Sequence, residues 1–183
     1  MKFVDEDGNH IINEKDMQVI GDPNPDLYGN IFTNVRWKNL SLDVVFNYSL
    51  GNDVYNYQRR LLEGGSRFHN QTTAMLSRWT HEGQKTDIPR IYYLDAPGNS
   101  RFSDRWIEDG SYLRLKNVEL SYTFKNNWLK KMGINSCRLY LNGDNLYMWT
   151  DMPDDREANY GTGSSDGAYP TVRRFNLGID ITL

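Results

Sequence analysis

This sequence has one cysteine, no long apolar run and little net charge, and each shortage excludes a class of protein. A single cysteine cannot form an internal disulfide framework or a cysteine-built zinc site. The 21 basic and 24 acidic residues give a formal net charge of −3, which excludes the broad basic surface of a general nucleic-acid binder. No stretch approaches the roughly 18 apolar residues of a membrane-spanning helix. A mean hydropathy of −0.72 does not exclude membrane-spanning strands, because those alternate apolar with polar residues.

The start of the sequence gives no targeting signal. Residues 1–7 lack the apolar segment of a secretory signal peptide. Either the protein is cytoplasmic, or the chain is a piece whose export signal lies upstream. The patterns further along the chain favour the second alternative.

Residues 28–50 predict a β-hairpin. If Lys38 and Asn39 form a two-residue turn, Trp37 faces Leu40. Every second residue of one strand then faces every second residue of the other, with increasing distance from the turn. One face of the hairpin is then almost entirely apolar, and the other carries asparagine, arginine and aspartate. A slip of one residue would destroy this segregation, so the pattern specifies the register.

The rest of the chain predicts three more strands separated by connections of very different length. Each strand alternates apolar with polar residues, and the predicted strands span residues 112–124, 134–146 and 172–183. A short helical turn ended by Gly133 joins the first two of these strands. The long connections cover residues 52–111, with short helices expected at 55–62 and 72–82, and the loop 147–170.

This rhythm of short and long connections is typical of outer-membrane barrels, which have short periplasmic turns and long extracellular loops. A soluble β-sandwich also alternates apolar with polar residues, so alternation alone leaves both folds open.

Three blocks of sequence resemble one family, the SusC/RagA-like TonB-dependent outer-membrane transporters. They are the run GDPNP at 21–25 followed by YGN at 28–30, the segment DRWIEDGSYLRLKNV at 104–118, and LYLNGDNL at 139–146 followed by Tyr169-Pro170. The blocks occur in the family's order and correspond only to the C-terminal part of such a transporter. The family's plug domain and TonB-contact motif are not in this chain.

The resemblance implies an all-β fold, in which an antiparallel meander forms the last five strands of a transmembrane β-barrel with long extracellular loops. Residues 1–27 would be an extracellular loop segment, and 28–183 the C-terminal part of the receptor barrel. It further implies location in the cell outer membrane and import of oligosaccharides or peptides, with no enzymatic activity. The implied partners are a SusD-like surface lipoprotein, the TonB system through the missing N-terminal part, the barrel-assembly machinery and the lipid bilayer. Nucleic acid is not among them.

The end of the chain fits the pattern that the barrel-assembly machinery reads in outer-membrane proteins, given the resemblance. A polar residue, a glycine and two apolar residues stand at Asn176, Gly178, Ile181 and Leu183. A final strand with a free edge and one apolar face can be captured by strand addition. The family usually ends in phenylalanine, whereas this chain ends in leucine.

An acidic run near the start resembles a calcium loop. Asp5, Asp7 and Asn9 occupy its first, third and fifth positions, and Asp16 its twelfth. Two departures favour the alternative of a hydrogen-bonded Asx turn: His10 replaces the expected glycine, and aspartate replaces the longer glutamate. No other cofactor is expected.

Aromatic residues of the long loops are candidates for stacking on a ligand or partner. The candidate ligand-binding residues are Trp79, Tyr92, Tyr93, Trp106 and Trp149. Their alternative role is to pack the loops together. Trp37 and Phe124 instead stand beside the short turns, where an interfacial aromatic girdle is expected.

Three functions are therefore compared. The leading hypothesis is a C-terminal part of an outer-membrane nutrient importer. The alternatives are a soluble carbohydrate-binding β-domain and, on weaker grounds, a glycan hydrolase, because the sequence has many carboxylates but no recognisable catalytic motif.

Overall fold

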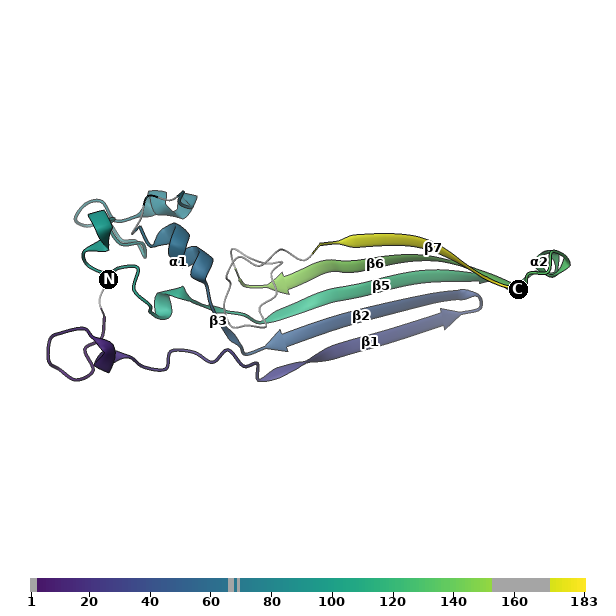
Figure 1. Ribbon diagram of the computed structural model, residues 1–183, viewed down its shortest axis with the longest axis horizontal. Helices are drawn as coiled ribbons and strands as arrows, with labels where there is room; N and C mark the ends of the chain where they lie inside the picture. The colour runs from purple at the N-terminus through teal and green to yellow at the C-terminus, as the bar shows by residue number, and fades with distance from the viewer. Residues whose placement is uncertain (1–2, 66–67, 69, 153–171) are drawn as a thin grey trace. The chain divides into compact units, whose positions relative to one another are not determined.

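A computed structural model describes residues 3–65, 68, 70–152 and 172–183 of the chain (Figure 1). The chain divides into two compact units. The sheet unit contains described residues 24–52, 109–152 and 172–183, and the loop unit contains residues 3–23 and 53–108. In the described ranges, no helix is long and apolar enough to cross a membrane.

The sheet unit is built on five antiparallel strands in the order β1-β2-β5-β6-β7 (Figure 1). The strands span Leu27–Trp37 (β1), Leu40–Leu50 (β2), Tyr112–Phe124 (β5), Ser136–Thr150 (β6) and Arg174–Thr182 (β7). Each strand pairs with the strand that precedes it in the sheet order, which makes the sheet a meander. The predicted five-stranded antiparallel meander is thus confirmed. The sheet is open, with β1 and β7 at its two edges.

The first hairpin has the register that the sequence predicts. Trp37 pairs with Leu40, and the pairing continues through Val35 with Leu42 to Leu27 with Leu50. Lys38, the first residue of the turn, adopts a φ of 54°. This left-handed backbone is what tight two-residue hairpins require, although glycine or asparagine adopts it at lower cost than lysine.

A β-bulge in β5 changes which residues face which side. Lys116 has no partner in β2, because Asn117 pairs with Val45 and Leu115 pairs with Phe46. Simple alternation through 112–124 would put Leu113 and Leu115 on the polar face with Asn117. The bulge reverses the alternation, so that both leucines join the apolar face.

Two other predictions of element boundaries were wrong. The strand predicted to end at Leu146 continues to Thr150, because Tyr147 to Thr150 pair with the first residues of β5. The helix expected at 72–82 is only a 3-10 helix, Thr73–Ser77 (η2). The helix ends at Ser77 because the backbone of Arg78 is no longer helical, with a ψ of 154°. The side chain of Thr86 donates to the carbonyl of Ser77 at 2.7 Å, which a continuing helix would have used.

The loop unit is organised around a small buried core. The two-stranded sheet of β3 (Asp53–Tyr55) and β4 (Ile107–Asp109) carries this core, and Val54 and Trp106 are both fully buried. Asn56 caps the helix α1 (Tyr57–Glu63) by accepting from the backbone N–H of Arg59 at 2.8 Å. The remaining elements of the loop unit are the 3-10 helices η1 (Glu14–Asp16), η3 (Tyr93–Asp95) and η4 (Asp104–Trp106).

A short helix, α2 (Asn127–Lys131), joins β5 to β6 at the turn end of the sheet. Gly133 follows it with a φ of 77°. This is the left-handed position at which a helix commonly ends, and it confirms the predicted helical turn.

Candidate functional site

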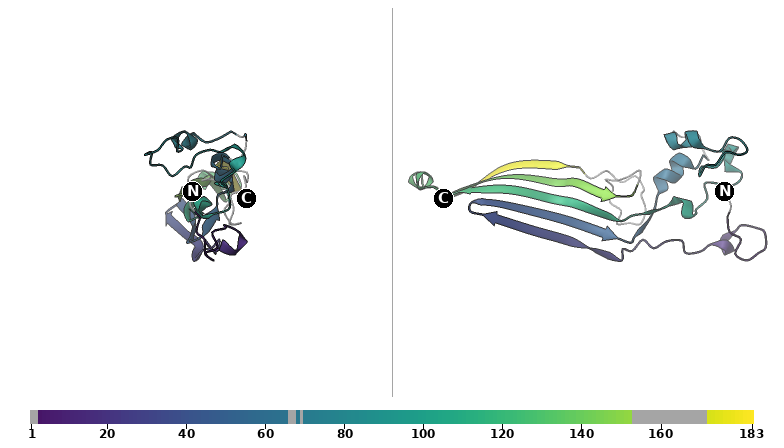
Figure 2. Two further views of the ribbon diagram at one scale, coloured as in Figure 1. Left: turned by 90° about the vertical axis from the view of Figure 1, so that its left-hand side faces the viewer. Right: turned by 180° about the vertical axis from the view of Figure 1, so that it is seen from behind.

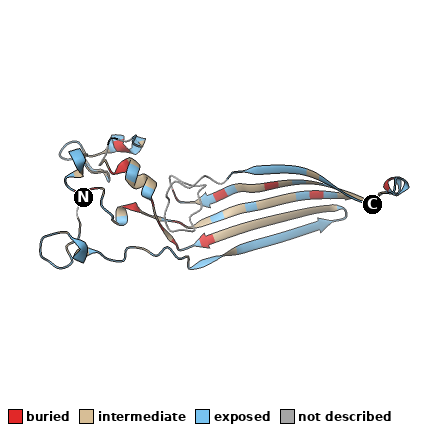
Figure 3. Ribbon diagram, in the orientation of Figure 1, coloured by how far each residue is buried: buried red, intermediate tan, exposed pale blue. Residues whose placement is uncertain are grey.

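One face of the sheet carries an uncovered apolar band. Paired residues of neighbouring strands point to the same side, so the register defines rows of side chains across the sheet. One row is aliphatic in all five strands: Val35, Leu42, Leu120, Leu141 and Leu177. Among the described residues of the sheet unit, no second layer covers this row, and Leu120, Leu141 and Leu177 are 44–73% exposed (Figures 2 and 3). A soluble sheet of this size would bury such a row.

Aromatic residues stand at both ends of the band. At the turn end, Trp37 lies in a row with Tyr122, and the Tyr122 ring meets Phe124 edge-on at 4.6 Å. At the loop end, Tyr147 and Trp149 are in edge-on contact at 4.7 Å on the same face of β6. Trp37 and Phe124 therefore lie at the position expected for an interfacial aromatic girdle on the turn side.

The two aromatic ends are eight residues apart along β2, which carries no inserted residue. Leu40 is in the row of Trp37 and Tyr122, and Tyr48 is in the row of Leu113 and Trp149. At about 3.3 Å per residue and a strand tilt of about 40°, this corresponds to roughly 20 Å along the membrane normal. The apolar band on outer-membrane barrels is about 25 Å tall, so the two aromatic ends lie close to the two borders of such a band.

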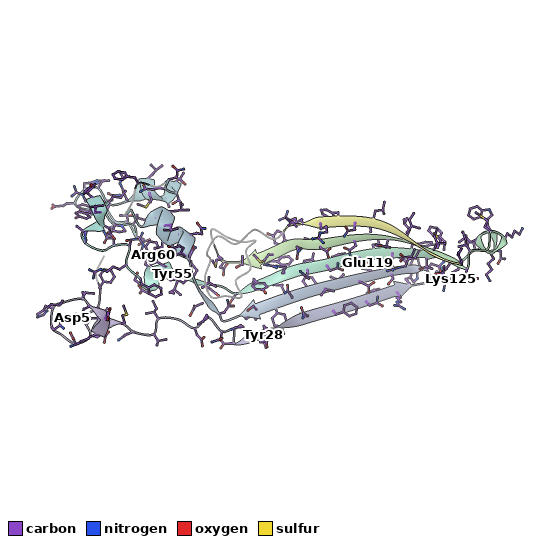
Figure 4. All side chains as sticks on the ribbon, in the orientation of Figure 1. Asp5, Tyr28, Tyr55, Arg60, Glu119 and Lys125 are labelled. Carbon is purple, nitrogen blue, oxygen red and sulfur yellow. The ribbon has the colours of Figure 1, made fainter. Side chains whose placement is uncertain are left out.

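The opposite face carries a row that is polar in all five strands. This row contains Asn34, Asp43, Glu119, Asn142 and Asn176. Arg138 bridges two strands beside this row: it pairs with Glu119, which is labelled in Figure 4, and with Asp180 at 3.2 Å. A face with polar and charged side chains of this kind can line a hydrated space.

The structure gives local roles to the residues of the predicted assembly signal. The side-chain amide of Asn176 donates to the Asn142 oxygen at 3.4 Å. Ile181 lies on the apolar face opposite Cys137, and Leu183 is exposed. Gly178 pairs with Tyr140, and a Cβ atom built there would lie 2.2 Å from the tyrosine ring. Recognition of these residues by an assembly machinery stays a prediction.

Gly178→Ala is expected to lower the free energy of unfolding by about 1–3 kcal/mol, because the new methyl group must displace the Tyr140 ring. Urea unfolding followed by tryptophan fluorescence measures the change. In a Tyr140→Ala background the same substitution should be neutral or slightly stabilising, because the space is free and alanine suits a strand better than glycine. Equal destabilisation in both backgrounds would refute the packing role.

Two of the candidate ligand-binding aromatics line one hollow in the loop unit. The hollow has a volume of about 410 Å³, and its lining includes Trp79, Tyr92, Asp87, Arg90 and Asn99. The Arg90 guanidinium lies over the Tyr92 ring at 5.6 Å. A volume of this size, with aromatic faces beside a few polar groups, suits a small polar ligand such as one or two sugar units or a short peptide.

The other three candidates lie elsewhere. Trp149 belongs to the apolar face of the sheet unit, as described above. Tyr93 is exposed beside Phe68, with the ring centroids 6.4 Å apart. Trp106 is fully buried, and its indole N–H donates to the Arg101 carbonyl at 2.9 Å. Ligand contact by these three residues stays a prediction, and sequence alone did not reveal that Trp106 is a core residue.

An ionic cluster lies next to Trp106, and sequence reasoning missed it. Burial alone would lower the pKa of Arg59, but its hydrogen bonds to Glu108 and Glu63 outweigh burial and leave the pKa raised. The neighbouring Arg105 stacks over the Trp106 ring at 4.5 Å. Its pKa is lowered by burial and by repulsion from Arg59. This cluster links α1 to β4 within the loop unit.

The predicted calcium ligands converge in part. Carboxylate oxygens of Asp5, Asp7 and Asp16 lie within 4.8 Å of one another. The Asn9 side-chain amide donates to Asp7 at 2.7 Å. The backbone N–H of Asn13, together with others, lowers the pKa of Asp16. His10 has a φ of 62°, so the position where calcium loops carry glycine does adopt the backbone that glycine favours.

We propose calcium binding as the alternative to an Asx turn alone, with a Kd of about 10⁻⁴ to 10⁻³ M, because only three carboxylates converge. Calorimetry with calcium chloride measures it. Asp16→Asn should abolish the heat of binding, whereas Glu14→Gln, which removes a neighbouring charge outside the cluster, should preserve it. No heat at millimolar calcium would leave the loop as an Asx turn only.

Comparisons with known proteins agree with this architecture. No family model matches the chain. The chain is 37% identical over 190 residues to TonB-dependent receptor P3 of Formosa agariphila, covering 98% of the chain and 18% of that receptor. It is 25% identical over 183 residues to TonB-dependent receptor SusC of Bacteroides thetaiotaomicron, covering 98% of the chain and 17% of SusC.

Solved structures show the same likeness. A chain of the RagAB peptide importer in the closed-closed state superposes with a TM-score of 0.78 and 28% identity, covering 97% of this chain and 20% of the other. The open-open state gives a TM-score of 0.75 and 27% identity, covering 87% of this chain and 17% of the other. The chain therefore spans about a fifth of the length of the proteins it matches.

The fold and the uncovered face agree with these comparisons: the chain is similar along nearly its whole length to part of a TonB-dependent receptor, and it has the fold of the matching part of the RagAB importer chain. Among TonB-dependent receptors, the matches to SusC and to the RagAB structures confirm the resemblance to the SusC/RagA-like members.

Proposed function

We propose that this chain is the C-terminal part of an outer-membrane TonB-dependent importer that takes up oligosaccharides or peptides. The observation that carries the proposal is the aliphatic row Val35–Leu42–Leu120–Leu141–Leu177, which the sheet unit leaves uncovered between two aromatic ends. Acyl chains are the environment that such a band fits. The relatives are receptors and transporters, which supports a role other than catalysis.

The polar face would form part of the lumen wall. A charged side chain on the lipid side costs about 2–4 kcal/mol near the bilayer midplane. Asp43, Glu119, Arg138 and Asp180 all lie on the face opposite the aliphatic row, where water or the plug domain of a complete receptor would contact them.

The direction of the strands in the membrane follows from the connections. The turn at Lys38 and the helix α2 are short and would face the periplasm. Residues 1–27 and 52–111 would lie outside the cell, together with 151–170, because β6 continues to Thr150. Part of the last segment is beyond the described residues.

The partners are proposed from the relatives. SusC and the RagAB importer support a SusD-like surface lipoprotein as a lid and the TonB system as the source of energy. Contact with TonB would require a part of the receptor outside this chain. The barrel-assembly machinery would insert the complete barrel by its last strand.

The hollow beside Trp79 and Tyr92 is the proposed contact for the incoming nutrient. Its aromatic faces suit sugar rings or apolar peptide side chains, and Asp87, Arg90 and Asn99 supply hydrogen bonds. The same hollow would serve a soluble carbohydrate-binding domain, the second candidate. The uncovered aliphatic row argues against that candidate, because a soluble domain would bury it.

Growth on a panel of oligosaccharides and peptides tests the proposal. Cells that lack the complete receptor should fail to grow on one nutrient class, and the wild-type receptor should restore growth and co-purify with a surface lipoprotein. A receptor with Trp79→Ala and Tyr92→Ala should reach the outer membrane normally but need a higher nutrient concentration. Unchanged growth across the panel, with no lipoprotein partner, would contradict an importer.

A further inference from the structure

The connection between β5 and β6 has an unusual charge for this chain. Residues 125–135 contain three lysines, Lys125, Lys130 and Lys131, and no acidic residue, although the whole chain carries a net charge of −3. All three lysines are exposed. Figure 4 labels Lys125 at the α2 end of the sheet.

The segment is held firmly on the sheet. Leu129 is only 8% exposed, and its carbonyl accepts the backbone N–H of Ile134 at 3.0 Å. The backbone N–H of Asn135 donates to the carbonyl of Thr182 in β7 at 2.8 Å. Side chains on α2 are therefore presented in a fixed direction relative to the strands.

The exposed side of α2 is amphipathic. Trp128 and Met132 are four residues apart, so they share one side of the helix with Leu129 beside them, yet they are 67% and 59% exposed. Lys131 is three residues from Trp128 and therefore borders this strip, whereas Lys130 lies further round the helix turn. An apolar strip bordered by lysines, with tryptophan in the strip, is the arrangement of a helix that lies in a lipid headgroup region.

The position of α2 continues the apolar band. Phe124 ends β5 on the apolar face and contacts Tyr122 at the turn-side aromatic row, and α2 begins three residues later. Trp128 therefore lies just beyond the level at which the band ends. Lipid phosphates lie at that level when the band is in a bilayer.

We propose that α2 docks on the membrane surface at the turn side, with Trp128 and Met132 among the glycerol and upper acyl groups and the three lysines on the phosphates of anionic phospholipid. This inference rests on the proposed function, because it requires the sheet to span a bilayer. Docking of α2 would fix the depth and tilt of the last strands in the membrane.

Fluorescence quenching in lipid vesicles tests the depth of Trp128. The complete receptor is reconstituted with brominated phosphatidylcholine, and the signal of Trp128 is obtained as the difference from Trp128→Phe. Trp149, measured in the same way with Trp149→Phe, reports whether the sheet itself is in the membrane. We expect quenching of both residues, with Trp128 quenched most by bromines close to the headgroup.

The two failures are distinguishable. If Trp149 is quenched by brominated lipid and Trp128 is quenched only by aqueous acrylamide, α2 faces water or a periplasmic protein and the inference is overturned. If neither residue is quenched by brominated lipid, the membrane assignment itself is wrong.

The lysines are tested by charge reversal. In vesicles that contain phosphatidylglycerol, brominated phosphatidylglycerol should quench Trp128 more strongly than brominated phosphatidylcholine, with a preference of up to roughly fivefold per lysine. Lys130→Glu with Lys131→Glu should remove this preference. The matched control, Lys15→Glu with Lys85→Glu, makes the same change in net charge at exposed lysines of the loop unit and should retain it. Equal preference in both double variants would contradict phosphate binding by α2.

Discussion

Leu141→Arg should lower the free energy of unfolding of the membrane-embedded barrel by about 1–2 kcal/mol, the cost of arginine on the lipid side between the midplane and the interface. Leu141 lies in the aliphatic row next to the turn-side aromatic row, with Leu120 and Leu177 as its neighbours on the adjoining strands. No carboxylate lies in this row. The amount of receptor in the outer membrane should fall accordingly, and urea unfolding in vesicles measures the loss of stability directly.

Asn142→Arg is the matched control. Asn142 is the next residue of the same strand, but it lies on the polar face opposite Glu119. An arginine there gains a carboxylate neighbour and stays in water, so stability should change by less than about 1 kcal/mol. If both arginines were tolerated, or if the control were the more harmful, the apolar face would not be in contact with lipid.

Trp106→Ala should destabilise the loop unit by about 3–5 kcal/mol. The ring is fully buried, its N–H is hydrogen-bonded to Arg101, and its removal would leave a large cavity beneath Arg105. Because residues 53–108 fold around this ring, the variant should be cleaved by protease within that segment at concentrations that leave the wild-type receptor intact. Limited proteolysis followed by mass spectrometry measures this.

Tyr93→Ala separates packing from ligand contact. Tyr93 is 75% exposed, so its truncation should leave protease resistance unchanged while weakening ligand binding if the ring contacts the ligand.

Protease resistance in Trp106→Ala equal to that of the wild type would show that Trp106 is not required for the core.

The strands and their register could be predicted because a half-buried strand repeats every two residues. In the hairpin from Leu27 to Leu50, the alternation of apolar and polar residues admits one register, and the structure has that register. The bulge at Lys116 could not be predicted in this way, because an inserted residue leaves no mark on composition. The one indication in the sequence is that simple alternation would place Leu113 and Leu115 on the polar face, which suggests that the alternation is interrupted before Asn117.

The loop unit was less predictable because its contacts join residues far apart in sequence. Residues 72–82 have helical propensity, but the side chains of Gln84 and Thr86 bind the carbonyls that a continuing helix would need. Trp79 and Tyr92 line one hollow, whereas Trp106 is buried and Trp149 lies on the sheet. From the sequence, all of these aromatic residues were equal candidates for ligand contact, because the sequence does not show which of them are buried.

The central claim is that lipid contacts the face of Leu120, Leu141 and Leu177 and that water contacts the face of Glu119, Asn142 and Asn176. Spin labels on single cysteines at these six positions, in a Cys137→Ser background of the complete receptor in vesicles, test it most directly. The account predicts that collisions with molecular oxygen dominate at the three leucine positions and that collisions with an aqueous nickel chelate dominate at the three polar positions. Equal access of the nickel chelate to both sets would contradict it.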